Sequence, residues 1–254
     1  YKKQRKADHS AKKERLQALI TDIYHEYNGR PGHRMMVVYL RRRGIRLSKT
    51  TVLKYMRERN LHSVVNPRKY RYKKGDCYKR FNNLFNRDFK AAAPNQKWCT
   101  DFTYIFLSGG AKRYNCSIID LYDHSVATTN GRRMDSILAI DTLRKALDKN
   151  PAAKETVILH SDQGSQYTSR AFIEYCESMH VTQSMSRAGC PYDNAPMESF
   201  YGTFKAEFIG QHTFEDEDQL DQATDDYVYC YYNHIRPHSS NNYLTPFEKR
   251  HQDV

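Results

Sequence analysis

The chain has 254 residues, 39% of them hydrophobic and 28% charged, with a formal net charge of +12. This composition is typical of a globular protein of one large or two modest domains, and no stretch approaches the roughly 18 apolar residues of a membrane span. The basic start lacks the apolar segment of a secretory signal, and the six cysteines form no CxxC pair, which argues against a disulfide scaffold and a structural zinc site.

The positive charge is concentrated in the N-terminal third of the chain. Residues 1–90 carry 26 basic and 7 acidic residues, a net charge of +19, whereas residues 91–254 have a net charge of −7. A basic segment of this kind suits the phosphate backbone of a nucleic acid, because binding releases condensed counterions. The alternative is a solvated basic face without a specific partner. We expect DNA as the partner.

Residues 1–62 are predicted to form a helical DNA-binding domain. Apolar residues recur at helical spacing over 11–28, a second helix is expected over 33–43, and Ser48 is a suitable N-cap for a third at 49–59. A helix, a short turn and a basic helix are typical of a helix-turn-helix unit, although a helical bundle without a DNA role would show the same pattern. The outward face of the third helix would present Lys49, Thr50, Lys54 and Arg57 to DNA.

Residues 63–95 are predicted to be a linker. They contain the basic and aromatic run NPRKYRYKKGDCYKRFNN, which shows little periodicity. Such a segment could follow a phosphate backbone with its tyrosines stacking on bases, or it could be a passive tether.

Residues 96–254 are predicted to form an α/β domain with a mixed sheet and helices packed on it. Residues 97–107 and 112–122 are rich in β-branched and aromatic residues and predict an antiparallel hairpin. Further strands are expected at 124–130, 155–162 and 181–186. Helices are expected at 136–149, 169–179 and 215–232, and within 191–209 after the early proline residues of that segment.

Three acidic residues of this domain stand in unusual places. Asp101 lies within an apolar strand, Asp162 directly follows another, and Glu198 lies on a later helix. A charged carboxylate in an apolar strand is costly without a partner, and gathered carboxylates repel one another. Divalent cations remove both costs, and hard oxygen ligands favour Mg²⁺ or Mn²⁺. We therefore predict a two-metal site of the kind that cleaves or exchanges phosphodiester bonds.

Other residues near these acids are predicted to assist them. Lys205 and Asn194 fall on the same helical face as Glu198 and would contact DNA. The alternative for Lys205 is an ordinary surface charge. His160 and Gln163 flank Asp162 and would either position it or contact DNA; the alternative is that they only satisfy backbone groups at the strand end. Arg187 follows a strand and would bind a phosphate.

Several segments together resemble the DDE transposases of bacterial insertion sequences. WCTDFTYI (98–105), HSDQGSQYTS (160–169) and SRAGCPYDNAPMESFYGTFKAE (186–207) resemble the three catalytic blocks of that family. The match is best with the OrfB-type proteins of the insertion-sequence-three family, which are relatives of retroviral integrases. The tail YYNHIRPHSSNNYLTPFEKR (231–250) and residues 16–62 are also similar to that family, so the resemblance covers most of the chain.

The resemblance implies an RNase H-like catalytic domain of the integrase type with a mixed five-stranded sheet, preceded by an all-α helix-turn-helix domain. It implies that Asp101, Asp162 and Glu198 bind two Mg²⁺ or Mn²⁺ ions and that Lys205 contacts DNA. The expected partners are the terminal inverted repeats of an element, its target DNA, and at least one further copy of the chain. An upstream helix-turn-helix and leucine-zipper protein or fused region is also implied, as is a bacterial cytoplasmic location at the nucleoid.

Two alternatives remain at this point. One is a simple metal-dependent nuclease related to RNase H, which would have no need of a basic DNA-reading domain. The other is a noncatalytic DNA-binding regulator, which would have no need of the acidic triad.

Overall fold

The computed structural model describes residues 2–65, 81–153 and 156–252. The chain divides into two compact units, Tyr1–Arg68 and Lys69–Val254. Each unit has its own hydrophobic core, and each is described by itself below.

The N-terminal unit consists of three helices: α1 (Lys2–Glu26), α2 (His33–Arg42) and α3 (Lys49–Glu58). Their apolar faces meet in one core, which includes Ile20, Ile23, Met36, Leu40, Val52 and Met56. The side chain of Ser48 accepts a hydrogen bond from the backbone N–H of Thr51 and caps α3 as predicted. Helix α1 begins well before the predicted residue 11, because periodicity marks only the half of the helix that packs on the core.

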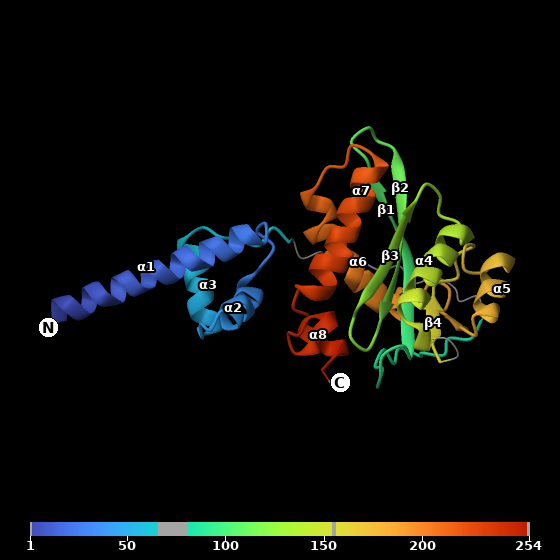
Figure 1. Cartoon of the computed structure of the whole chain (residues 1–254), viewed down its shortest axis with the longest axis horizontal. Helices are drawn as coiled ribbons and strands as arrows, with labels where there is room; N and C mark the ends of the chain where they lie inside the picture. Colours follow the sequence, from blue (N-terminus) through green and yellow to red (C-terminus); the bar gives the residue numbers. More distant parts are fainter. Residues whose placement is uncertain (1, 66–80, 154–155, 253–254) are drawn as a thin grey trace. The chain divides into compact units, whose positions relative to one another are not determined.

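The second unit is built on a mixed five-stranded sheet, as predicted (Figure 1). Its strands are β1 (Lys97–Phe106), β2 (Lys112–Asp120), β3 (Val126–Gly131), β4 (Ile158–Ser161) and β5 (Thr182–Met185), in the spatial order β3-β2-β1-β4-β5. Strands β1, β2 and β3 are antiparallel neighbours, whereas β4 is parallel to both β1 and β5. The alternation of side chains along β1 sends Trp98 to one hydrophobic core and Cys99 to the other.

Helices cover both faces of this sheet (Figure 1). Helices α4 (Ser136–Lys149) and α5 (Arg170–Ser178) pack on the Trp98 face. Helices α6 (Ala195–Glu207) and α7 (Glu217–Asp225), together with a π-helical continuation over Asp226–Tyr232, pack on the Cys99 face. The helix predicted after the early proline residues of 191–209 is α6, and Pro191–Asn194 forms a separate 3₁₀ turn before it.

Residues 81–95, which were predicted to belong to a linker, pack on the second unit. Phe85 is buried in the core beneath α6, and its ring stacks on the imidazole of His160 with centroids 4.7 Å apart. The backbone N–H of Leu84 also donates to the hydroxyl of Ser184 at 2.9 Å. The packing of Phe85 could not be predicted from the polar and basic sequence around it, because a single buried ring creates no periodic pattern. Residues 66–80 of the predicted linker lie outside the described residues.

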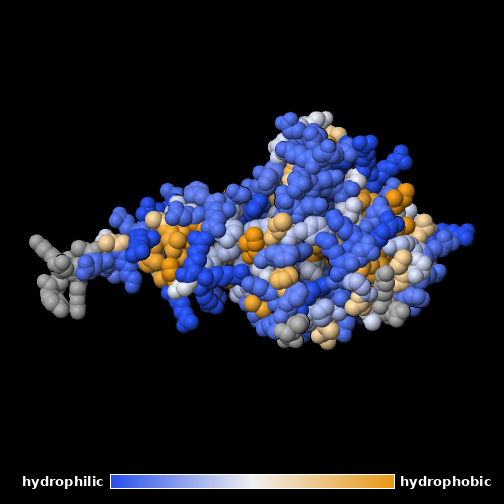
Figure 2. All heavy atoms as spheres, in the orientation of Figure 1, coloured by the Kyte–Doolittle hydropathy of each residue, from blue (hydrophilic) through white to orange (hydrophobic). Residues whose placement is uncertain are grey.

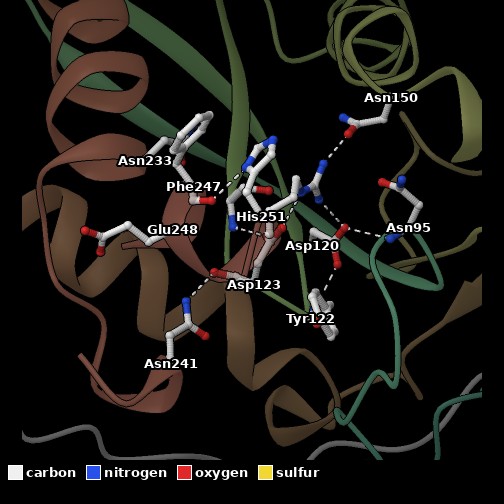
Figure 3. A network of polar contacts seen from close by, with 12 residues as sticks. Asn95, Asp120, Tyr122, Asp123, Asn150, Asn233, Asn241, Phe247, Glu248 and His251 are labelled. Atoms are coloured by element: carbon white, nitrogen blue, oxygen red, sulfur yellow. Dashed lines mark hydrogen bonds and ion pairs between the residues drawn. The ribbon is translucent and has the colours of Figure 1, made fainter. Parts of the chain in front are cut away.

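Arg250 connects the C-terminal helix α8 (Pro246–Arg250) to a polar network in which Figure 3 labels Asp120, Asp123 and Asn150. The guanidinium of Arg250 pairs with the buried carboxylates of Asp120 and Asp123, at 2.7 Å in the case of Asp120. The indole N–H of Trp98 donates to the same Asp120 oxygen at 3.2 Å. Burial raises the pKa of Asp120 and the nearby Asp123 raises it further, while Arg250 opposes the shift. These contacts tie the end of the chain to the strand ends.

No described helix has the length and apolar character needed to cross a membrane. On the face drawn in Figure 2, hydrophilic residues dominate and apolar residues form separate groups.

Candidate active site

Two of the predicted acidic residues meet at neighbouring parallel strands. Asp101 lies in the middle of β1, and Asp162 directly follows β4. The register pairs Cys99 of β1 with His160 of β4. Two residues further along each strand, Asp101 therefore comes beside Asp162 and on the same face, with a strand spacing of about 4.8 Å.

The third acidic residue, Glu198, comes from the first turn of α6. This helix is held on β1 at the critical point, because the hydroxyl of Tyr201 donates to the backbone carbonyl of Asp101 at 2.6 Å. Charges on Glu198 and on Lys205, which lies further along α6, both act on the carboxyl of Asp101. The structure thus brings the three predicted acids and Lys205 into one neighbourhood.

The carboxyl groups of Asp101 and Asp162 both have raised pKa values. Burial, followed by the nearby charge of Asp162, raises the pKa of Asp101 to about 7. Burial also raises the pKa of Asp162, although a hydrogen bond from the backbone N–H of Gly164 at 2.8 Å opposes the shift. Neither aspartate forms a salt bridge with any residue that the structure describes. A bound cation would relieve this unfavourable arrangement.

The ligand chemistry fits a hard divalent cation, although the side chains are not arranged as a finished metal site. Within the described parts of the chain, no three His, Cys, Asp or Glu side chains converge closely enough to hold an ion. Next to Asp101, the amide of Asn194 donates from Nδ2 to a carboxylate oxygen at 3.3 Å, while its own Oδ1 is buried without a hydrogen-bond partner. Carboxylate oxygens beside an unsatisfied amide oxygen are the donors that Mg²⁺ and Mn²⁺ prefer.

The structure places Asn194 before α6 rather than within the predicted helix, and it places His160 in the buried interior of the sheet. Asn194 precedes α6, in the 3₁₀ turn, but still reaches Asp101. The imidazole of His160 is fully buried behind the acids, where Nδ1 contacts the hydroxyl of Ser184 at 2.8 Å and Nε2 that of Ser186 at 3.1 Å. Burial lowers the pKa of His160 to about 4, so a neutral imidazole joins β4 to β5.

Gln163 and Arg187 both contact the chain segment that leads into α6. The amide of Gln163 donates to the backbone carbonyl of Ser186 at 3.0 Å. The guanidinium of Arg187, which was predicted to bind phosphate, makes a two-pronged contact with Asp193 at 2.8 and 3.0 Å. A phosphate contact by Arg187 stays a prediction, and its present partner is a carboxylate.

Asp193 is the functional candidate that the sequence interpretation missed. Its carboxylate is fully buried and accepts hydrogen bonds from Arg187, from Arg87 at 2.7 Å and from Asn83 at 3.0 Å. These partners, Arg187 above all, hold the pKa of Asp193 far below its ordinary value. An aspartate just before a helix is easily explained as a helix cap, and nothing local points to Arg87, which is 106 residues away. Asp193 joins the 81–89 segment to the start of the helix that carries Glu198.

A second buried ion pair secures the other end of α6. The guanidinium of Arg236 pairs with the carboxylate of Glu207 through contacts of 2.7 and 2.8 Å, and both side chains are largely buried. The 3₁₀ turn before α6 is therefore held by Asp193, and the last turn of α6 is held by Glu207. This rigidity fixes the position of Glu198 relative to the strand that carries Asp101.

In the N-terminal unit, the predicted outward face of α3 is exposed. Lys49, Thr50, Lys54 and Arg57 are all accessible, whereas Val52 and Met56 face the core. Glu58 at the end of the helix is paired with Lys13 of α1 at 2.8 Å. The exposed face is thus basic, as an interface with DNA requires.

The chain is similar in sequence to transposases of insertion sequence elements and in fold to an integrase core domain. Residues 91–191 and 179–246 match families described as Integrase core domain, and residues 11–70 match one described as HTH-like domain. The chain is 36% identical over 250 residues to the transposase for insertion sequence element IS904 of Lactococcus lactis, covering 96% of this chain and 98% of that protein. It is 34% identical over 233 residues to InsK of insertion sequence element IS150 of Escherichia coli, covering 92% and 82%.

A solved structure shares the fold at lower identity. The catalytic core domain of HTLV-2 integrase, determined with magnesium in a dimeric form, has a TM-score of 0.52 and 18% identity, covering 64% of this chain and all of that domain. The integrase-type fold predicted from the sequence is confirmed.

Proposed function

Because the chain belongs to the transposases of insertion sequence elements, which contain an integrase core domain, we propose that Asp101, Asp162 and Glu198 form the metal-dependent site that cuts and joins the element's DNA. The observation that carries this proposal is the parallel register of β1 and β4. In this register two partly buried carboxylates come side by side, and the hydrogen bond from Tyr201 keeps α6, with Glu198 in its first turn, against β1.

The residues would hold two Mg²⁺ or Mn²⁺ ions. Asp101 and Asp162 supply carboxylate oxygens, Glu198 adds a third carboxylate, and the free Oδ1 of Asn194 is a further oxygen donor. His160 does not compete as a ligand, because both of its ring nitrogens contact serines. A pair of such ions activates an attacking oxygen and stabilises the oxygen that leaves the phosphorus.

The protein's own groups prepare this site for DNA. The carboxyl of Asp101, with a pKa of about 7, releases its remaining proton when it takes up a cation. Lys205 lowers that pKa and lies two helical turns beyond Glu198, where its ammonium suits a phosphate oxygen. Tyr201 keeps the helix against the strand, so that the acids and the lysine stay in register with a bound DNA strand.

The reaction has two steps at the same phosphodiester-exchange site. In the first, water attacks phosphorus, a new P–O bond forms and the bond to the 3′-oxygen breaks, which leaves a free 3′-hydroxyl at the element's end. In the second, that hydroxyl attacks another phosphodiester, so the number of phosphodiester bonds is conserved. Both steps require the same stabilisation of attacking and leaving oxygens.

The N-terminal unit would supply recognition of the element's ends. Its match to an HTH-like domain and the exposed Lys49, Thr50, Lys54 and Arg57 support docking of α3 in the major groove. Joining two ends requires at least two copies of the chain, and the HTLV-2 core is itself described in a dimeric form. An upstream helix-turn-helix and leucine-zipper region, and location at the nucleoid, complete this proposal.

The test is a reaction on labelled DNA that carries the element's ends, with Mg²⁺, with Mn²⁺ or with EDTA. We expect cleaved and joined products from the parent chain with either metal. Glu198→Gln should lose both products and still bind the ends, whereas Glu177→Gln on the exposed side of α5 should behave like the parent.

Other outcomes would support the rival functions. Cleavage without joined products would indicate a nuclease. Binding of the ends by all three proteins without any metal-dependent product would indicate a noncatalytic DNA-binding protein.

A further inference from the structure

The outer end of the β1–β2 hairpin carries two exposed aromatic rings. Tyr104 and Phe106 are each 53% exposed, and their ring centroids are 5.5 Å apart in an edge-to-face arrangement. The residues between and before them, Thr103 and Ile105, point to the opposite, buried face of the strand. Strand β4 pairs with β1 only over Lys97–Cys99, so this end of the hairpin lies beyond the region that α4 and α5 cover (Figure 1).

Two lysines lie over these rings. The ammonium of Lys112, which is opposite Phe106 in the β ladder, is 5.1 Å from the centroid of Tyr104 and 5.6 Å from that of Phe106. The ammonium of Lys205 approaches Tyr104 from α6, at 5.4 Å. We call Tyr104, Phe106 and Lys112 the hairpin platform. It combines flat apolar faces with positive charge, a combination suited to a ligand that has both a π-face and a phosphate.

The hairpin platform adjoins the acidic site. Tyr104 is three residues beyond Asp101 on the same strand, a distance of about 10 Å along the backbone, and its side chain leaves the strand on the other face. Lys205 connects the two places, since its charge lowers the pKa of Asp101 and its ammonium also lies over the ring of Tyr104. Lys205 can reach Tyr104 around the edge of β1, because β4 does not pair with β1 at this point. A DNA strand whose phosphate is held at Lys205 would therefore have a neighbouring nucleotide within reach of Tyr104.

We propose that the hairpin platform stacks an unpaired nucleobase of the DNA strand that is bound at the acidic site. This inference rests on the proposed function, because it assigns the platform to the same DNA. The base must be unpaired and at a strand end or flipped out, since both faces of a base inside a duplex are covered by its neighbours. The lysines favour DNA over a second protein surface, because they would face phosphates rather than other side chains.

The experiment measures stacking without chemistry. The 254-residue chain is titrated in EDTA with a duplex that ends in a short single-stranded overhang and with a blunt duplex of the same length. The overhang contains a fluorescent adenine analogue whose emission is quenched by stacking. We expect quenching and tighter binding of the overhang duplex by the parent chain.

Variants separate the aromatic platform from general DNA binding. In Tyr104→Ala, the ratio of overhang affinity to blunt affinity should fall about tenfold, with loss of quenching, because stacking on one aromatic ring contributes at that level. Tyr104→Phe should keep the ratio and the quenching. Phe247→Ala, which removes an exposed ring of α8, serves as the matched control and should resemble the parent.

Unchanged quenching in the Tyr104→Ala, Phe106→Ala double variant would overturn the inference. So would a change in oligomeric state with no change in quenching, since the patch would then be an interface between copies of the chain. Failure of the proposed function has a different signature, in which the metal-dependent products are missing while quenching by the platform persists. Both rings are half exposed, and an unchanged melting temperature of the variants will verify that they fold.

Discussion

Replacing Asp101 with asparagine should stabilise the metal-free protein, although it should destroy the metal site. The pKa of Asp101 is raised from 3.8 to about 7 in the folded chain. A raised carboxyl pKa means that ionisation opposes folding. The contribution of Asp101 to stability is fully present below the pKa that this carboxyl has in the unfolded chain. It is lost as the pH rises through the pKa of the folded chain. The asparagine side chain cannot ionise, so the variant is spared this loss.

The size of the effect follows from the shift. A difference of about 3 pH units at roughly 1.4 kcal/mol each corresponds to about 4 kcal/mol at and above pH 7, as an upper bound. At pH 5 the same relation gives a destabilisation of about 2 kcal/mol, because pH 5 lies only a little above the pKa of this carboxyl group in the unfolded chain. The advantage of Asp101→Asn over the parent should therefore grow across this range.

Urea unfolding in EDTA between pH 5 and pH 8 will measure the difference. The only tryptophan of the chain, Trp98, is buried in the second unit and reports the unfolding of that unit alone. Added Mg²⁺ should stabilise the parent and leave Asp101→Asn unaffected, because binding to the folded state alone raises stability. Asp141→Asn is the control, because the Asp141 side chain on α4 is 43% exposed and its partner Arg144 is also on the surface. A pH-independent difference between parent and Asp101→Asn, or a less stable variant at pH 8, would refute the reasoning.

Two further predictions concern charges elsewhere in the chain. Asp193→Asn should lower the free energy of unfolding by about 2–3 kcal/mol at neutral pH, because charged hydrogen bonds from Arg187 and Arg87 are lost. This loss of stability relative to the parent should disappear as the pH falls below the ordinary range of carboxyl pKa values, because the parent's Asp193 then becomes protonated. A difference in stability that stays constant down to pH 2 would contradict the lowered pKa of Asp193. Lys54→Gln in α3 should weaken DNA binding and reduce the slope of log affinity against log salt concentration by about 1. Titrations at several salt concentrations will measure this slope. An unchanged slope would mean that Lys54 does not contact a DNA phosphate.

Local patterns in the sequence determined much of this molecule. Hydrophobic periodicity and strand composition predicted the three N-terminal helices, the hairpin, the strand before Asp162 and the helix that carries Glu198. The outward basic face of α3 followed in the same way, since a helix of known phase fixes which side chains leave the core. An aspartate within an apolar strand was conspicuous for its desolvation cost alone, and its surrounding motifs supplied the family resemblance.

The tertiary structure alone decided which distant groups meet. The register of β1 against β4 places Asp101 beside Asp162, and a shift of one residue would have sent one of them to the other face. The pairing of Arg87 with Asp193 likewise depends on how the 81–89 segment folds back, and no local pattern encodes a partner more than a hundred residues away. Periodicity shows that a side chain points inward or outward, but the energy of a buried charge depends on its neighbours, which only the packed fold assembles.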